Sequence, residues 1–575
     1  MMTRNIKTII ACLLCCNIVA ALTSCGEDFL EVQSKTEGTT GNFYTSESAL
    51  SRALIGCYDA WQCTVSSGPV FTLLYMSDLL SDECFGGTGN SDARNSQVVD
   101  RFDISEDNSQ VDLHNDLWKY YYQAIYTVNE LILHENEVSW SSDATHGRLI
   151  GEARAIRGIL YFDLARIFEN VPLLTVPSTD NVPQAPVDDV YEQIFSDLKY
   201  AADNIPADAY PKSSSSTNDG RITCYAAKAM LARAYLFYTG VYGKEPQTVT
   251  KAEVLQGLED IVKSGEYSLV PLYKNLWYAA STTWEGSDQN GWKEVSTYAG
   301  EDNQENILTM KFNYTSDYNG NAGGNNAIQM LSIRGGTFKA PYGEGWGGAT
   351  VGKQFFESYP AGDQRRDASI IDLDAEGITA MADYQQNGLQ KQREYTGYFN
   401  KKYTARSAYL HNESSGSWSL THYWNDVQGG DFMISQAIGY TLMRYADVLL
   451  MAAELGSANA QSYLNQVHCR AYATENEDGS VNTPILSVAV TKENIMEERR
   501  LEFAFEGLRY WDLLRQGVDV AARAIVASGE TVLDGGQENL VTFKADNIIA
   551  KRGFQQIPLT QIQLSNGVLK QNAGW

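Results

Sequence analysis

The stretch EERRLEFAFEGLRYWDLLRQG, residues 497–517, has the apolar spacing of a helix that buries one face. The sequence predicts one helix over residues 492–515, which ends before Gly517. Its expected buried stripe consists of Leu501, Ala504, Phe505, Leu508 and Trp511. The charged side chains are expected on a solvated face, with ion pairs at i,i+3 and i,i+4. They are Glu497, Glu498, Arg499, Arg500, Glu502 and Arg509.

Helical periodicity recurs on both sides of a long middle region that lacks it. The sequence predicts helices at 115–135, 151–168, 189–203, 223–238 and 441–456. Short polar breaks separate them, and small residues fall where neighbouring helices must touch. This arrangement is typical of tetratricopeptide-like helix pairs, although no strict 34-residue period is present.

The middle of the chain, residues 265–440, is dense in glycine and polar residues, which favour loops. Six of the eleven tryptophans fall in it: Trp277, Trp284, Trp292, Trp346, Trp418 and Trp424. Long loops on a rigid scaffold often carry binding residues. The region is therefore the expected ligand-binding lobe, between helical scaffolds at 43–264 and 441–575.

The N-terminus predicts a secretory signal at residues 1–24, with a basic start and a short apolar run. The last residues, Leu22-Thr23-Ser24-Cys25, match a bacterial lipoprotein cleavage site, so Cys25 is the expected lipid attachment. An ordinary cleavage site with a chance cysteine is the alternative. Residues 25–42 are then a flexible, lipidated tether, and more than one acyl chain gives stable anchoring to a membrane.

Charge and cysteine content exclude some classes of protein. The formal net charge is −27, and loss of two basic residues with the signal takes it to −29. Such a surface repels nucleic acid, and no basic stripe interrupts it. Five cysteines remain after Cys25, namely Cys57, Cys63, Cys84, Cys224 and Cys469, too scattered for a disulfide framework.

Five segments resemble one family, the SusD/RagB-like outer-membrane lipoproteins. They are CGEDFL (25–30), GEARAIRGILYFDLARIFENVPLLT (151–175), MRYADVLLMAAE (443–454), the opening stretch (497–517) and IPLTQIQLSNGVLKQNAGW (557–575). They occur in the family's order and span the chain.

The resemblance implies a mainly α fold, in which four tetratricopeptide-like helix pairs support a loop-rich lobe with few short strands. It implies a lipid-anchored protein on the outer membrane that faces the exterior. The protein would capture an oligosaccharide or polysaccharide and deliver it to a TonB-dependent, SusC-like transporter. It implies neither catalysis nor a cofactor. A peptide-capturing relative and a lipid-anchored glycoside hydrolase remain the alternatives.

The first candidate for ligand contact is Trp346, in KAPYGEGWGGATVGKQFF (339–356). Flat aromatic rings can cover the apolar faces of sugars, and the surrounding glycines leave this ring uncovered. The resemblance also places a stacking aromatic in this region. Tyr342 is a companion candidate, and the alternative for both is a packed loop anchor.

Two other regions hold candidates. Trp284 and Trp292 lie in the polar segment 282–306, while Arg94 in the loop 81–97 could bond sugar hydroxyls. Trp277, by contrast, is expected in the core.

One acidic segment has a pattern that resembles a metal-binding loop. Asp372, Asp374, Glu376 and Asp383, with Gly377, echo the spacing of a calcium-binding EF-hand loop. The last ligand should be glutamate, and no helix pair flanks the loop. The sequence thus offers only a weak pattern for calcium.

Overall fold

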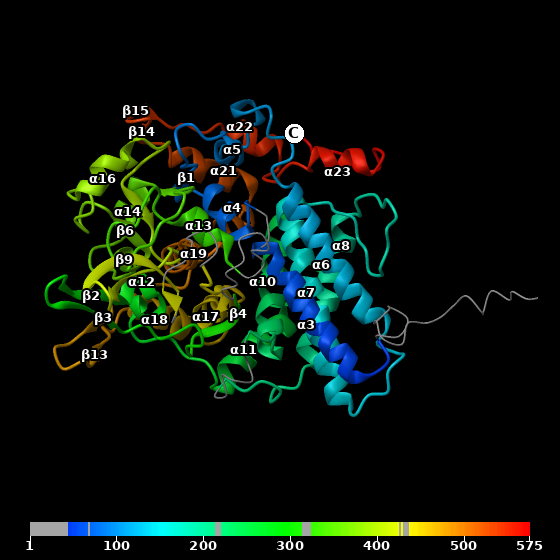
Figure 1. Ribbon diagram of the computed structural model, residues 1–575. Helices are drawn as coiled ribbons and strands as arrows, with labels where there is room; N and C mark the ends of the chain where they lie inside the picture. The colour runs from blue at the N-terminus through cyan, green and yellow to red at the C-terminus, as the bar shows by residue number, and fades with distance from the viewer. Residues whose placement is uncertain (1–43, 67–69, 213–219, 313–323, 425–426, 429–435) are drawn as a thin grey trace, which may run out of the picture.

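The computed structural model describes residues 44–66, 70–212, 220–312, 324–424, 427–428 and 436–575. The predicted signal, Cys25 and the tether lie outside the described residues. Figure 1 shows the helices of the first half on one side and the loop-rich lobe on the other.

Helices pack in pairs that follow the order of the chain. The pairs are α3 (Glu47–Ser66) with α6 (Asn115–Leu133), α7 (Asp143–Phe168) with α8 (Val187–Asn204), α10 (Cys224–Tyr242) with α11 (Lys251–Ser264), and α17 (Tyr445–Glu454) with α18 (Ala460–Ala471). Each pair stacks on the next through α6 and α7, α8 and α10, and α11 and α17. The predicted mainly α fold with four tetratricopeptide-like pairs is confirmed.

Glycines allow the closest of these pairs to form. A Cβ at Gly151 of α7 would lie 2.6 Å from Cγ1 of Ile205, just beyond α8. A Cβ at Gly158 would lie 3.0 Å from Cγ of Leu198 in α8. Because packed interiors leave no room for such overlaps, the small residues set the separation of these two helices.

A small antiparallel sheet organises part of the lobe. Its order is β1 (Cys84–Phe85), β5 (Thr350–Val351), β7 (Tyr398–Asn400) and β6 (Ile370–Asp372). Phe85, the last residue of β1, pairs with Thr350, the first residue of β5. The loop that follows β1 and the loop that precedes β5 therefore leave the sheet at the same edge.

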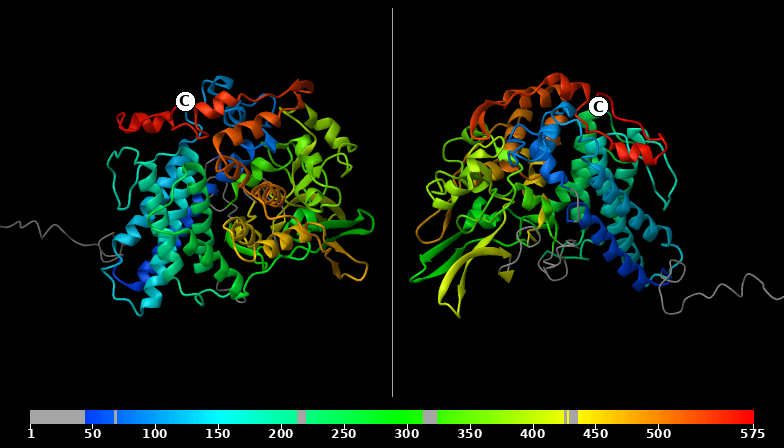
Figure 2. Two further views of the ribbon diagram at one scale, coloured as in Figure 1. Left: turned by 180° about the vertical axis from the view of Figure 1, so that it is seen from behind. Right: turned by 45° about the horizontal axis from the view of Figure 1, so that its top comes forward.

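Two hairpins project from the lobe on the side away from α3 and α6 (Figure 2). One joins β2 (Thr282–Ser287) to β3 (Gly291–Ser296), and the other joins β8 (Ser407–Asn412) to β9 (Ser417–Trp424). Short strands are thus confined to the lobe and to a few hairpins among the helices.

Two predicted helices differ in extent. The expected helix at 492–515 is interrupted between α19 (Lys492–Glu502) and α20 (Arg509–Leu514). Phe505 and Gly507 adopt positive φ angles of 62° and 77°, which a helix cannot contain. The expected helix at 441–456 begins later, because Tyr440–Arg444 forms strand β11 and pairs with β4 (Asn306–Met310).

The predicted solvated face of α19 is wrong. Glu502 is fully buried, and Glu498 and Arg499 are buried nearly as completely. The reason is that α19 packs against α17 and α18 on one side and against α15 (Arg365–Ser369) of the lobe on another. Its charges are paired inside the protein: Arg365, Arg444 and Arg470 all contact Glu502. Of the six charged residues predicted on that face, only Glu497 is exposed, while Arg500 and Arg509 are half-buried.

Candidate ligand-binding site

The loop that carries Trp346 is pinned to the protein by its backbone. The N–H groups of residues 345–348 donate to carbonyls of residues 329–333 over 2.6–2.9 Å. These carbonyls belong to α13 (Asn326–Leu331) and the residues that follow it. The loop backbone is therefore fixed against residues 329–333, and this fixes the position of the Trp346 side chain.

Glycines make this close seating possible. A Cβ at Gly345 would lie 2.5 Å from Cβ of Ser332, and one at Gly348 would lie 2.5 Å from Oη of Tyr75. The Trp346 side chain consequently turns outward and is 37% exposed. Among the tryptophans whose side chains the structure describes, it is the most exposed.

A second loop, residues 86–94, lies beside the first. Arg334 connects the two loops, since its Nη1 donates to the carbonyl of Trp346 (3.1 Å) and pairs with Asp92 (3.3 Å). Arg393 holds the second loop by donating to the carbonyls of Asn90, Asp92 and Ala93 over 2.5–3.1 Å. The structure thus places an exposed ring next to a polar rim.

Arg94 ends this second loop, directly before α5 (Asn95–Asp100). Its side chain is 42% exposed and lies 3.7 Å from Glu106. A guanidinium with this exposure keeps donors free for a ligand. The sequence predicted Arg94 but missed Arg334 and Asp92, because their pairing across more than two hundred residues leaves no local signal.

Buried charges support the second loop from beneath. Asp100 accepts a hydrogen bond from the backbone N–H of Gly86 (2.8 Å), and Arg101 bridges Asp100 and Glu394. Burial raises the pKa of Asp100 to about 6 and that of Glu394 to about 8, although Arg101 opposes both shifts. These groups are sealed from ligand, so they position the loop.

Glu83, directly before β1, has a buried carboxyl group that should make the stability of the protein depend on pH. It is 1% exposed, and neither carboxylate oxygen has a hydrogen-bond partner. Burial raises its pKa to about 8 from the ordinary 4.5. The folded protein thus holds this proton more tightly than the unfolded chain, so ionisation of Glu83 costs stability progressively as pH rises from 4.5 to about 8.

We therefore expect Glu83→Gln to stabilise the protein at pH 9 far more than at pH 5. The difference should be a few kcal/mol, since each unit of pKa shift is worth about 1.4 kcal/mol. Urea unfolding at both pH values measures it, with Glu477→Gln on an exposed residue as the control. An equal effect of Glu83→Gln at both pH values would contradict the assignment.

Tyr342, in contrast to expectation, is an interior residue. It is 3% exposed and belongs to a second core cluster with Phe338, Ile371 and Phe399. Its hydroxyl donates to Glu376 over 2.7 Å. With its ring covered and its hydroxyl engaged, Tyr342 supports the lobe and has no surface to offer a ligand.

Trp284 and Trp292 lie on the β2–β3 hairpin and are half-buried. The Trp292 ring stacks on Tyr409 of β8 at 3.9 Å and 6°, and Trp284 meets the same tyrosine edge-on at 5.8 Å. These contacts bind the two hairpins together. One contact of Glu344, 4.0 Å from His422 of β9, connects the Trp346 loop to the hairpins. Trp277, as predicted, is in the core.

The side chains of the calcium-like pattern have other partners in the fold. Glu376 is taken up by Lys401 (2.9 Å), Lys339 (3.5 Å) and Tyr342. Asp372 accepts hydrogen bonds from the backbone of residues 374 and 375, and Asp374 accepts one from Thr379. Asp383 lies exposed at the start of α16 (Ala382–Asn387). Within the described residues no group of three or more acidic, histidine or cysteine side chains could hold a metal.

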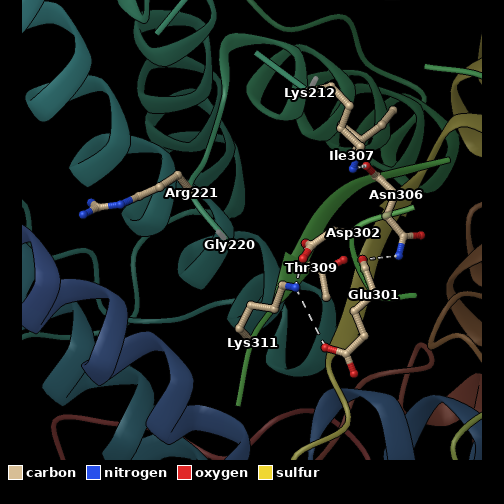
Figure 3. A pocket seen from close by; sticks show the side chains of 9 residues that line it. All are labelled: Lys212, Gly220, Arg221, Glu301, Asp302, Asn306, Ile307, Thr309 and Lys311. Atoms are coloured by element: carbon tan, nitrogen blue, oxygen red, sulfur yellow. Dashed lines mark hydrogen bonds and ion pairs between the residues drawn. The ribbon is translucent and has the colours of Figure 1, made fainter. Parts of the chain in front are cut away.

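Charged side chains line a small cavity between the scaffold and the lobe (Figure 3). Lys311 pairs there with Asp302 over 2.7 Å, and Arg221 points away toward Glu152, which it meets at 3.3 Å. Burial lowers the pKa of Lys212 to about 8. The volume, about 20 Å³, fits about one water molecule, so this cavity is structural.

Comparison with protein families decides what the chain is. A family model described as "SusD family" matches residues 284–575. This chain belongs to the SusD family. A second model, "Starch-binding associating with outer membrane", matches residues 28–236, so the two together span most of the chain. The description of the second model indicates a family that binds glycan, namely starch, in association with the outer membrane.

Individual relatives agree with this assignment. SusD-like protein P2 of Formosa agariphila is 25% identical over 519 residues, which is 87% of this chain and 89% of the relative. Surface glycan-binding protein A from Bacteroides fluxus has a TM-score of 0.69 at 23% identity, covering 92% of this chain and 99% of that one.

A further structure is described as a laminarin-binding SusD-like protein, with a TM-score of 0.68 at 24% identity and coverage of 92% and 100%. At these identities the structural likenesses establish the SusD fold. The described part of the chain contains no helix that is both long and apolar enough to cross a membrane.

Proposed function

We propose that this SusD family member captures an oligosaccharide or polysaccharide at the cell surface and delivers it to a TonB-dependent, SusC-like transporter. The observation that carries the proposal is Trp346, an exposed indole on a loop that four backbone hydrogen bonds hold in place. A ring held in this way loses little conformational freedom on stacking against a sugar, which favours binding.

The rim beside Trp346 suits hydroxyl groups. Arg94 and Arg334 supply N–H donors, and Asp92 supplies an acceptor, all on loops that are tied to each other. Trp284 and Trp292 are proposed as a weaker, flanking contact, because Tyr409 covers one face of Trp292. Neutral hydroxyls and a shallow surface predict affinities on the order of micromolar or weaker.

We propose that the protein binds its ligand without catalysis. We also propose that a lipid on Cys25 anchors it to the outer membrane, with the protein facing the exterior. Asp92, next to the proposed platform, is already paired with Arg334. A glycosidase needs two carboxylates free to act on the scissile bond. The intact mass of the purified mature protein checks the anchor, and co-purification in detergent checks the transporter partner.

Calorimetry of the chain from residue 26 against a panel of polysaccharides tests the function. Laminarin and its hexasaccharide come first, because one similar structure is described as a laminarin binder and another as a complex with laminarihexaose. Starch, xylan and a set of peptides complete the panel. Binding to peptides alone would indicate a peptide-capturing relative, and release of reducing ends would indicate a glycoside hydrolase.

A further inference from the structure

A groove of about 930 Å³ lies on the surface far along the chain from the Trp346 loop. Its floor is α18, one wall is the loop 267–271, and the other is the extended segment 483–486 that follows β13 (Val481–Asn482). Its volume is within the range of sites that bind ligands. It has no assigned role.

The groove is free of exposed charge, although a fifth of the residues in this chain are charged. Of the residues that line it, only Arg470 is charged, and that side chain is 3% exposed and paired with Glu305 and Glu502. The other lining side chains are uncharged: aliphatic groups, carboxamides, hydroxyls, one thiol and two tyrosines. Tyr267 and Tyr445, its aromatic residues, are buried, so no open ring faces a sugar.

One row of side chains on helix α18 already forms hydrogen bonds with an extended segment of this same chain. Gln461, Asn465 and Cys469, spaced four residues apart, meet the backbone of residues 486–488. The Gln461 amide donates to the Val488 carbonyl (2.8 Å), the Val488 N–H donates to Asn465 (3.3 Å), and the Leu486 N–H donates to Cys469 Sγ (3.2 Å).

The neighbouring ridge of α18 offers the same chemistry toward the groove. Ser462 and Gln466 lie four residues apart, both are exposed, and the only hydrogen bond recorded between them is a long one of 3.4 Å from the Gln466 amide to the Ser462 hydroxyl. Amide and hydroxyl groups at this spacing can bond the backbone of a second extended segment. The occupant suited to this groove is thus an uncharged, extended polypeptide with aliphatic side chains.

The chain carries such a segment at the rim of the groove itself. Residues 481–490, VNTPILSVAV, contain no charge, and Ile485 is 100% exposed. A projecting side chain beside a groove that can accept it is self-complementary, as a two-fold interface requires. We infer that a second copy of this chain docks here, each copy placing its Ile485 segment in the groove of the other.

Charge also favours this place of contact. Without the two basic residues of the predicted signal each copy has a formal net charge of −29, so two copies repel one another. The uncharged patch is where they approach without pairing like charges. The dissociation constant of the dimer should accordingly fall as added salt screens the repulsion. For an interface held by ion pairs, added salt would raise that constant.

A dimer carries two Trp346 platforms, and a polymeric glycan that reaches both binds with avidity. This consequence rests on the proposed function, whereas the dimer itself does not. Analytical ultracentrifugation without glycan therefore tests the dimer alone, and loss of glycan binding would leave its result unchanged.

The experiment compares the chain from residue 26 with three variants, between about 1 and 300 µM protein and about 0.05 and 0.5 M salt. The wild type should dimerise reversibly, with a dissociation constant on the order of 10–100 µM that falls with salt. Ile485→Asp and Ser462→Glu, which place charge on the rim and on the floor, should each raise that constant at least about tenfold.

Ile55→Asp, on α3, is the matched control, because Ile55 is also exposed (56%) but lies away from the groove. It should dimerise as the wild type does. Circular dichroism confirms that each variant is folded. A wild type that stays monomeric at the highest concentration overturns the inference, as does a dimer that both groove variants leave intact.

Discussion

Replacement of Trp346 by alanine should weaken glycan binding by roughly thirtyfold, equivalent to about 2 kcal/mol. Truncation of an aromatic residue at the centre of an interface often costs this much binding free energy, because the ligand loses a whole flat apolar surface. The surrounding fold should persist, since the side chain is 37% exposed and the loop is held through its backbone. Calorimetry with the best glycan of the panel measures the loss, and Trp346→Phe should recover part of it.

Trp292→Ala is the informative comparison. Its ring already stacks on Tyr409, so its removal should cost glycan affinity less than Trp346→Ala and should loosen the hairpins instead. The proposed site is wrong if Trp346→Ala binds as the wild type does. Loss of binding in Trp292→Ala alone would move the site to the β2–β3 and β8–β9 hairpins.

The helix pairs could be predicted because their signal is local. Apolar residues at helical spacing in 115–135, 151–168, 189–203 and 223–238 correspond to α6, α7, α8 and α10. The glycine-rich setting of Trp346 likewise indicated an uncovered ring, and the structure exposes it. Its part in binding stays a prediction, as do those of Arg94, Trp284 and Trp292.

Other features depend on residues that only the fold brings together. Arg and Glu alternate in α19 in the same way whether the helix faces water or the interior, so the pattern could not show that Glu502 is buried. Tyr342 was misplaced because the second core cluster that covers it comes from distant segments. The Arg334–Asp92 pair escaped notice for the same reason.

The buried charges around Arg444 tie the lobe to the helical scaffold. Arg444 of β11 contacts Glu305 beside β4, Glu502 of α19 and Glu506 in the turn that follows. Arg470 of α18 contacts Glu305 and Glu502 as well. Every one of these side chains is buried. Removal of one cation leaves carboxylates without compensation in the interior, which is far costlier than the loss of a surface pair.

Acid sensitivity reports on the same cluster. Burial alone would raise the pKa of Glu502, but Arg470, Arg444 and Arg365 hold it down to about 2. Because this pKa lies below the ordinary 4.5, Glu502 contributes stability above pH 4.5 that is lost as pH falls toward 2. In a variant without Arg444 the pKa of Glu502 should be lowered less strongly. Glu502 should then contribute less to the free energy of unfolding at neutral pH.

Arg444→Met should consequently lower the free energy of unfolding by about 3–5 kcal/mol at pH 7. Urea unfolding measures this change, and Arg366→Met serves as the matched control, because Arg366 pairs with Asp367 at the exposed surface and should cost about 0–1 kcal/mol. Adding Glu506→Gln to Arg444→Met should restore part of the stability, since one uncompensated charge is then neutralised. If Arg444→Met unfolds at the same urea concentration as Arg366→Met, the cluster does not hold the lobe and the scaffold together.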